Sequence, residues 1–176
     1  MIKTIIVPTD GSDHATKAVE LAADIAAKYG ARLVLLHALL HHTTAAELKA
    51  LLGGSAIPAD LAAKLEDLQD AVLDMAANSI EGGIIFVPIP DDVLREVGDK
   101  ILENARVTAE AKGVTEISAH RVDGNATQNI IAAAEHEGAD MIVMGSRGLG
   151  NIAGLLMGSV SHKVSHLAIC TCVTVK

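Results

Sequence analysis

Apolar residues along the chain fall into two patterns, short continuous runs and longer segments with helical spacing. The short runs are rich in Val, Ile and Leu and predict buried strands, and one alternating stretch predicts a further strand. These predicted strands lie within residues 2–10, 31–39, 114–122, 139–145 and 169–175. Between the first two, residues 13–29 have the spacing of an amphipathic helix. A strand–helix–strand unit of this length predicts parallel strands with a right-handed crossover.

Capping residues and glycines mark the ends of the predicted helices. Ser12 or Asp13 can begin the first helix, and Gly30 can end it because glycine readily adopts the left-handed conformation. Further helices are predicted within 41–58, over 92–112, from Asn125 or Thr127 to Gly138, and over 158–168. Another begins at Asp60 and carries on one face Leu61, Leu65, Leu68, Val72, Met75 and Ala76. An extended connection is predicted at 79–90. Strands interleaved with helices predict an α/β fold.

Composition narrows the classes of function. A length of 176 residues favours one domain, and a net charge of −8 argues against a nucleic-acid binder, since phosphate neutralisation requires an excess of Lys and Arg. Tyr29 and Phe86 are the only Tyr, Phe or Trp residues, which argues against a base-stacking platform. A single nucleotide needs only a few local donors. Pro8 and Asp10 come too early for a signal peptide and no apolar run is long enough to span a membrane, so we expect a soluble, cytoplasmic protein.

Cysteine and histidine pairs have simple structural interpretations. We interpret Cys170 and Cys172 as reduced, mostly buried thiols, because C-x-C is an unusual disulfide spacing and zinc sites need more ligands. His162 and His166 can share a helix face, but no third ligand lies at a recognisable spacing, so we interpret them as surface or partly packed residues. The sequence therefore predicts no metal site made of side chains.

The segment 144–163, MGSRGLGNIAGLLMGSVSHK, follows an apolar strand and contains five glycines. Gly145 and Gly148 leave backbone N–H groups without an adjacent Cβ, so an oxyanion can approach them closely. Gly158 and Ser159 begin the next helix, whose unpaired amides and positive dipole end attract phosphate. These features predict a phosphate-binding loop, and a tight loop that binds nothing is the alternative.

The spacing in this segment differs from that of other phosphate loops, since it lacks the Gly-Lys-Ser/Thr of a Walker loop and the G-x-G-x-x-G of the dinucleotide folds. Residues 149–157 are long enough to fold over a ligand, and Gly150 and Gly154 would give that span flexibility. Arg147 and Lys163 are the nearby cations that phosphates would meet.

Asp10 follows the first predicted strand within PTDGS, which is also ordinary turn chemistry at a helix entrance. In a 3-2-1-4-5 strand order, the first and fourth strands are neighbours at the point where the winding reverses, and ligands bind beyond such strand ends. Asp10 and the glycine-rich segment would then face one crevice. We therefore favour a ligand-binding role for Asp10 over a purely structural one.

These segments together resemble the universal stress protein family. Gly145, Gly148, Gly158 and Ser159 complete the G-x2-G-x9-G-[S/T] motif of its ATP-binding branch. Matching stretches cover about residues 1–39 and 114–176, including TIIVPTDGSDHATKAVELAADIA, GADMIVMGSRGLG and LLMGSVSHKVSHLAICTCVTV. The resemblance implies a single domain over 1–176 with a Rossmann-like, open five-stranded parallel sheet in the order 3-2-1-4-5, helices on both faces, and a helical insertion at about 41–113.

The resemblance also implies a ligand. ATP, or AMP or ADP, would lie across the switch point, with Mg²⁺ or Mn²⁺ bound through the phosphates. The implied contacts are Pro8, Thr9 and Asp10 with the adenosine, Ala38 with the adenine, Met144, Gly145, Arg147 and Gly148 with ribose and phosphates, and Gly158, Ser159 and Val160 with the phosphate chain.

The implied function is that of a nucleotide-dependent regulator or switch in the stress response, forming homodimers through the last strand, Ile169 to Val175. No catalytic residue is predicted, because no general base or nucleophile is identified near the phosphates. Slow ATP hydrolysis or self-phosphorylation, for example at Ser159, stays open by family analogy. The alternative is a non-enzymatic interaction protein that regulates a partner such as a transporter, through the inserted middle and without nucleotide.

Overall fold

The computed structural model describes residues 1–53, 57–78, 87–149 and 157–176. Its strands are β1 (Thr4–Pro8), β2 (Arg32–Ala38), β3 (Ile117–Val122), β4 (Met141–Gly145) and β5 (Thr171–Val175). Its helices are α1 (Asp13–Tyr29), α2 (Ala45–Leu52), α3 (Ala59–Asn78), α4 (Asp91–Ala111), α5 (Ala126–His136) and α6 (Ser159–Leu167). Each strand and helix predicted from the residue pattern is present. Most of the extended connection predicted at 79–90, as well as Gly150 and Gly154, lies outside the described residues.

The chain divides into two compact units. Met1–Leu39 and Gly98–Lys176 form one, which we call the sheet unit, and Leu40–Val97 form the other, which we call the helical unit. Both ends of the chain belong to the sheet unit. Because the sheet unit resumes at Gly98, it also includes the second half of α4.

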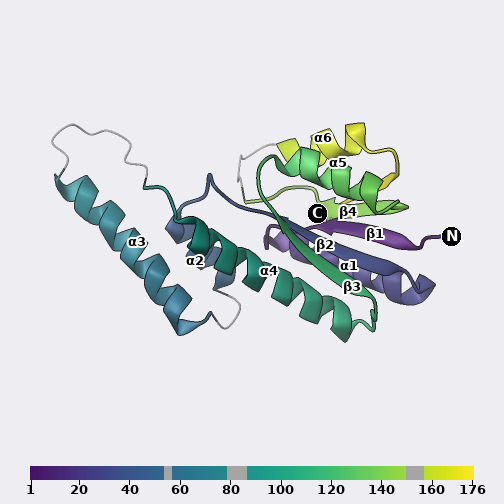
Figure 1. Cartoon of the computed structure of the whole chain (residues 1–176), viewed down its shortest axis with the longest axis horizontal. Coiled ribbons are helices and arrows are strands. Elements are labelled where there is room, and N and C mark those ends of the chain that lie inside the picture. The colour runs from purple at the N-terminus through teal and green to yellow at the C-terminus, as the bar shows by residue number, and fades with distance from the viewer. Residues whose placement is uncertain (54–56, 79–86, 150–156) are drawn as a thin grey trace. The chain divides into compact units, whose positions relative to one another are not determined.

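The five strands of the sheet unit form one parallel sheet in the order β3-β2-β1-β4-β5 (Figure 1). This is the predicted α/β architecture with the predicted order 3-2-1-4-5. Ile6 lies at the centre, aligned with Val34 of β2 on one side and Ile142 of β4 on the other. Parallel strands that are covered on both faces are apolar throughout, which explains the continuous runs in the sequence.

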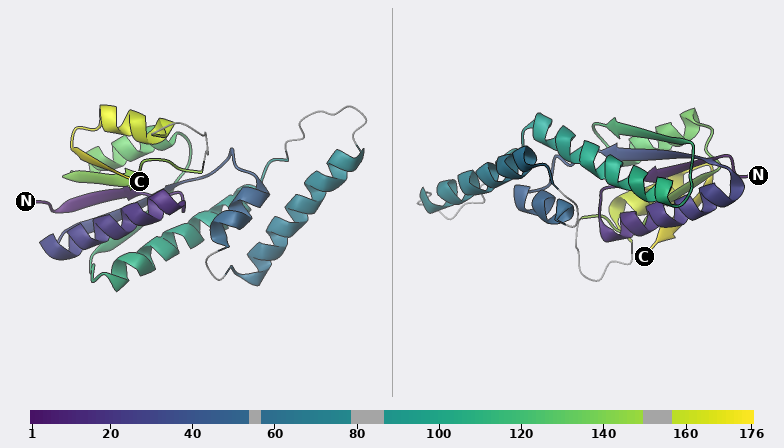
Figure 2. Two further views of the ribbon diagram at one scale, coloured as in Figure 1. Left: turned by 180° about the vertical axis from the view of Figure 1, so that it is seen from behind. Right: turned by 90° about the horizontal axis from the view of Figure 1, so that it is seen from below.

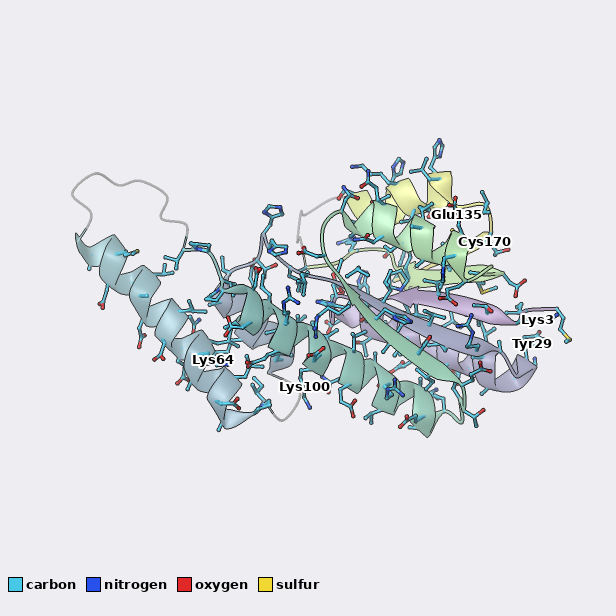
Figure 3. All side chains as sticks on the ribbon, viewed as in Figure 1. Lys3, Tyr29, Lys64, Lys100, Glu135 and Cys170 are labelled. Carbon is cyan, nitrogen blue, oxygen red and sulfur yellow. The ribbon has the colours of Figure 1, made fainter. Side chains whose placement is uncertain are left out.

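Side chains alternate between the two faces of the sheet along β1. Ile5 and Val7 pack on the side of α1 and the second half of α4, whereas Ile6 packs on the side of α5 and α6. Figure 2 shows α1 and α4 together on one face, and in Figure 3 the labelled Glu135 and Cys170 mark the other face. The buried face of α1 is almost entirely alanine, which allows this helix to lie close to the sheet.

The ends of the helices settle two alternatives that the sequence left open. Ser12, rather than Asp13, is the N-cap of α1, and its side chain accepts a hydrogen bond from the Ala15 N–H. Asn125 caps α5 in the same way, accepting from the Gln128 N–H at 3.1 Å. Gly30 ends α1 with φ at 64°, as predicted for a residue in the left-handed conformation.

In the helical unit, α2 packs along part of α3. A capping box between Thr44 and Glu47 begins α2, and Leu61 and Leu65 of α3 are buried. Met75, which we expected on the buried face of α3, is instead 55% exposed. Because α2 spans about 12 Å and α3 about 30 Å, α2 covers only part of the apolar face of α3.

Candidate functional site

The sheet order reverses between β1 and β4, because β1 leads to β2 on one side and β4 leads to β5 on the other. Ile5 lies opposite Met141, and the two parallel strands end near each other at Pro8 and Gly145. Ligands of open parallel sheets bind beyond the strand ends at such a reversal. We therefore look for a ligand-binding site in the segments that follow β1 and β4.

Asp10, immediately beyond β1, links these two segments. One carboxylate oxygen accepts hydrogen bonds from the N–H and the hydroxyl of Ser12, at 3.0 and 2.6 Å. The other accepts from the backbone N–H of Leu149, at 3.1 Å. The carboxylate thus accepts hydrogen bonds from the turn that opens α1 and, at the same time, from Leu149 beyond β4.

The geometry gives Gly145 and Gly148 a packing role in addition to the predicted one. A Cβ on Gly145 would lie 2.9 Å from the backbone of His14 and Ala15, where the alanine-faced helix α1 meets the end of β4. A Cβ on Gly148 would lie 2.2 Å from an Asp10 carboxylate oxygen. Real Cβ atoms do not make contacts this short. At Gly145 the neighbours are backbone atoms, so glycine is required there whether or not a ligand is bound, whereas a Cβ on Gly148 would displace the end of the Asp10 side chain.

Gly158 differs from these two glycines. It is the N-cap of α6 with φ at −74°, and a Cβ there would meet its nearest neighbour, the Cα of Arg147, at 3.5 Å. Neither the backbone conformation nor packing against the described residues therefore requires glycine here. The N-terminus of α6 has no side-chain cap, and both Ser159 and Val160 are exposed beside it. Free helix amides of this kind attract anions.

Ser146 connects the end of β4 to α6, a role that the sequence did not predict for it. Its carbonyl accepts from the Gly158 N–H at 2.8 Å and from the Ser161 hydroxyl at 2.7 Å. Its own hydroxyl lies 3.0 Å from Nδ1 of His14 on α1. Both serines are buried, and nothing in their sequence spacing distinguishes them from ordinary loop residues.

The remaining predicted contacts differ in exposure. Pro8 and Ala38 are half-buried at the carboxyl ends of β1 and β2, whereas Thr9 is buried. Met144 is buried too, and its side chain belongs to the core cluster on the α5 and α6 face. A ligand beyond β4 would therefore meet the backbone near Met144 rather than its thioether.

Arg147 is the cation that the structure brings to this edge. Its residue is half-buried, and its Nε is buried without a hydrogen-bond partner among the described residues. Lys163, the other predicted cation, is exposed on α6. An unpaired guanidinium N–H beside an uncapped helix N-terminus has the donor set that a phosphate oxygen requires, so these residues fit a nucleotide phosphate.

His37 on β2 is a buried titratable residue that the sequence reasoning missed. It is 1% exposed, and its Nδ1 lies 2.9 Å from the Thr9 carbonyl oxygen. Burial lowers the pKa of the imidazole below its usual value, although the Thr9 carbonyl and the Asp10 charge act in the opposite direction. The ring is therefore neutral at physiological pH. Its only signal in the sequence is a polar residue within an apolar strand.

The two pairs of potential metal ligands that the sequence offered, His162 with His166 and Cys170 with Cys172, do not form a metal centre within the described structure. His162 and His166 are both exposed on α6, as predicted, with ring planes only 9° apart and centroids separated by 6.2 Å. Nearly parallel rings cannot direct their lone pairs at one ion. Cys170 and Cys172 are free but half-buried rather than mostly buried, and partial burial raises the pKa of both thiols.

The described part of the chain has neither a membrane-spanning helix nor a group of metal ligands. No helix there combines the length and apolar character needed to cross a membrane. In the same residues, no three His, Cys, Asp or Glu side chains are grouped so that they could hold a metal ion.

Solved structures share this architecture over almost the whole chain. A universal stress protein in complex with cAMP superimposes with a TM-score of 0.58 at 25% identity, covering 99% of this chain and 96% of the other. The universal stress protein from Archaeoglobus fulgidus in complex with dAMP has a TM-score of 0.59 at 17% identity, covering 100% and 98% of the two chains. The second likeness shows the fold alone.

Sequence similarity extends over the same length. The universal stress protein YxiE of Bacillus subtilis (strain 168) is 31% identical over 181 aligned residues that cover 100% of both proteins. The profile of the universal stress protein family matches residues 1–176. The chain therefore belongs to the universal stress protein family.

Proposed function

We propose that the chain binds an adenine nucleotide, ATP in particular, beyond the ends of β1 and β4 and acts as a nucleotide-dependent regulator of the stress response. The observation that carries this proposal is the contrast among the motif glycines. Contacts within the chain explain Gly145 and Gly148, whereas among the described residues no contact gives a reason for glycine at position 158, where glycine also serves as the N-cap. A ligand that approaches the backbone at the start of α6 supplies that reason.

The donors around Gly158 support a phosphate as the group that approaches. Arg147 has a buried Nε without a partner in the described residues, and Ser159 places an exposed hydroxyl at the first turn of α6. A related universal stress protein was solved in complex with cAMP, and since cAMP is an adenine nucleotide, this supports an adenine nucleotide as the ligand. Pro8, Thr9 and Ala38 would then contact the adenosine, and Mg²⁺ or Mn²⁺ would be held through the phosphates.

The proposed role is binding, with at most slow hydrolysis. Asp10 already accepts three hydrogen bonds from protein groups, and the ring of His14 is engaged with the Ser146 hydroxyl. A general base must reach the attacking water, and both of these groups have other partners. Hydrolysis of a bound nucleotide would therefore be slower than its binding and release.

We further propose a homodimer formed through β5. This strand lies at the edge of the sheet, and the residue that leads into it, Ile169, is 83% exposed. An exposed strand edge with apolar neighbours favours pairing with another strand. Residues 41–113 are proposed as an insertion into a single universal stress protein domain.

Mass spectrometry of small molecules released from gently purified protein tests the nucleotide proposal. We expect ATP, ADP or AMP at a substantial fraction of one molecule per chain, and much less from the variant Gly158→Ala. Absence of nucleotide from the purified protein, together with no binding of added Mg-ATP, would favour the alternative of an interaction protein that works without nucleotide.

A further inference from the structure

The Thr9 carbonyl is where β1 leaves the sheet. The Thr9 N–H still donates to the Leu36 carbonyl of β2 at 2.9 Å, but the strand itself ends at Pro8. Thr9 is only 6% exposed, so its carbonyl needs a partner within the protein. The imidazole of His37, one residue beyond Leu36, occupies that place at 2.9 Å.

The proton on the ring can be assigned from this contact. A carbonyl oxygen only accepts, so Nδ1 of His37 carries the hydrogen and donates it. Nε2 is then a bare lone pair, and it is buried without a hydrogen-bond partner among the described residues. His37 is therefore present as the neutral Nδ1–H tautomer.

The contact reaches Asp10 through one peptide unit. The Thr9 carbonyl and the Asp10 N–H belong to the same rigid plane, so a bond that fixes the carbonyl also fixes the direction in which Asp10 leaves the strand. The Asp10 carboxylate in turn accepts from the Leu149 N–H. We infer that His37 is a positioning residue, which sets Asp10 and through it the position of the Leu149 N–H beyond β4. Its relevance to ligand affinity rests on the proposed nucleotide site.

Packing holds the ring in this orientation. A Cβ on Gly98 of α4 would lie 2.8 Å from Cδ2 and 3.2 Å from Nε2 of His37. The neighbouring Asp99 forms an ion pair with Arg121 of β3. Burial and the Arg121 charge lower the pKa of His37, whereas the Thr9 carbonyl and the charges of Asp10 and Asp99 raise it. Burial is the largest effect, so the neutral ring persists.

Hydrogen exchange of the Leu149 amide tests the role without any ligand. In His37→Leu the donor is lost at nearly constant volume, and we expect Leu149 to exchange at least tenfold faster. In His37→Asn the side-chain amide places a donor close to the position of Nδ1, and we expect most of the protection to return. Equal Leu149 exchange in wild type and His37→Leu would overturn the inference.

Leu33→Ala is the matched control, because Leu33 is buried on the same strand and packs in the core cluster on the α1 and α4 face. It should lower overall stability without selectively exposing the Leu149 amide. Should His37→Leu fail to fold, Gly98→Ala gives the same test from the other side of the ring. Alanine stabilises a helix more than glycine does, so this variant should not unfold α4. Faster Leu149 exchange would therefore come from displacement of the His37 ring by the new Cβ.

Nucleotide titration separates this inference from the proposed function. If wild type binds Mg-ATP, we expect at least tenfold weaker binding in His37→Leu and near-complete recovery in His37→Asn. If wild type binds no nucleotide, the proposed function fails, and the positioning role is still decided by Leu149 exchange. Nitrogen-15 shifts of the ring supply an independent check, since an Nε2–H tautomer at neutral pH would contradict the assignment.

Discussion

The carboxylate of Asp10 accepts a hydrogen bond from the backbone N–H of Leu149 at 3.1 Å, across 139 positions of sequence. It joins the turn after β1 to the loop after β4 at the point where the sheet order reverses. Gly148 allows this contact, because any side chain there would collide with the same carboxylate oxygen. The glycine motif therefore shapes the protein before any ligand arrives.

We expect Gly148→Ala to break this contact and lower the free energy of unfolding by about 1–2 kcal/mol, the usual contribution of a hydrogen bond to a partly exposed charged group. Urea unfolding measures the loss. Gly158→Ser is the control, because its Cβ would make ordinary contacts and serine is as good an N-cap as glycine, and we expect a change within about 0.5 kcal/mol. If the effects of Gly148→Ala and Asp10→Ala were simply additive in the double variant, the two residues would not be coupled as described.

Ser159 and Ser161 lie two positions apart on α6 and should respond differently to alanine. Ser161 is buried and donates to the Ser146 carbonyl, so Ser161→Ala should cost about 1 kcal/mol of stability. Ser159 is exposed, so Ser159→Ala should leave thermal unfolding unchanged while weakening Mg-ATP binding several-fold. Wild-type affinity in Ser159→Ala would remove its hydroxyl from the proposed site.

The Asp140 carboxylate accepts hydrogen bonds from the N–H groups of Lys3 and Thr4, at 2.6 and 3.1 Å, at the start of β1. These bonds favour the charged carboxylate and lower its pKa in the folded protein. Its stabilising effect is thus complete above the unfolded-state pKa and is lost as the pH falls through the lower folded-state pKa. We expect Asp140→Asn to lower the urea midpoint at pH 7, with a gap to wild type that narrows below about pH 4.

The control for this pH series is Glu20→Gln, which removes an exposed carboxylate from α1 and changes the net charge equally. A gap between wild type and Asp140→Asn that stays constant from pH 7 to pH 3 would show that ionisation of Asp140 does not contribute.

Ile169 tests the proposed dimer. Placing a charge at this exposed residue beside the edge strand β5 should prevent pairing, so Ile169→Asp should be a monomer by light scattering where wild type is a dimer. Val107→Asp is the matched control, since Val107 is 54% exposed on α4. A wild-type monomer at all concentrations would contradict the dimer, and equal dissociation by both variants would place its interface elsewhere.

The fold could be predicted because its determinants are local. Continuous apolar strands, amphipathic helices and capping residues such as Ser12 and Gly30 each lie within a few residues of the feature they specify. To predict where the site lies, the strand order had to be combined with only one rule, that ligands bind where the order of a parallel sheet reverses. The family resemblance implied the same order.

The details of the site could be predicted only in part. The glycines were identified, but the separate reasons for Gly145 and Gly148 depend on how closely α1 and Asp10 approach them in space. Likewise, His37 is an inconspicuous polar residue in an apolar strand until the Thr9 carbonyl is seen beside it. Such contacts join distant parts of the chain and have no signature in residue spacing.

Calorimetric titration of nucleotide-free protein with Mg-ATP, for wild type and Gly158→Ala side by side, tests the central claim most directly. Wild type should bind at submillimolar concentrations, and Gly158→Ala should bind at least tenfold more weakly, about 1.4 kcal/mol. Its thermal unfolding temperature should fall by no more than about 4 °C, the cost of alanine in place of glycine at an N-cap. No heat of binding in wild type at millimolar Mg-ATP, or equal affinity in the two proteins, would contradict a nucleotide phosphate held against the backbone at the start of α6.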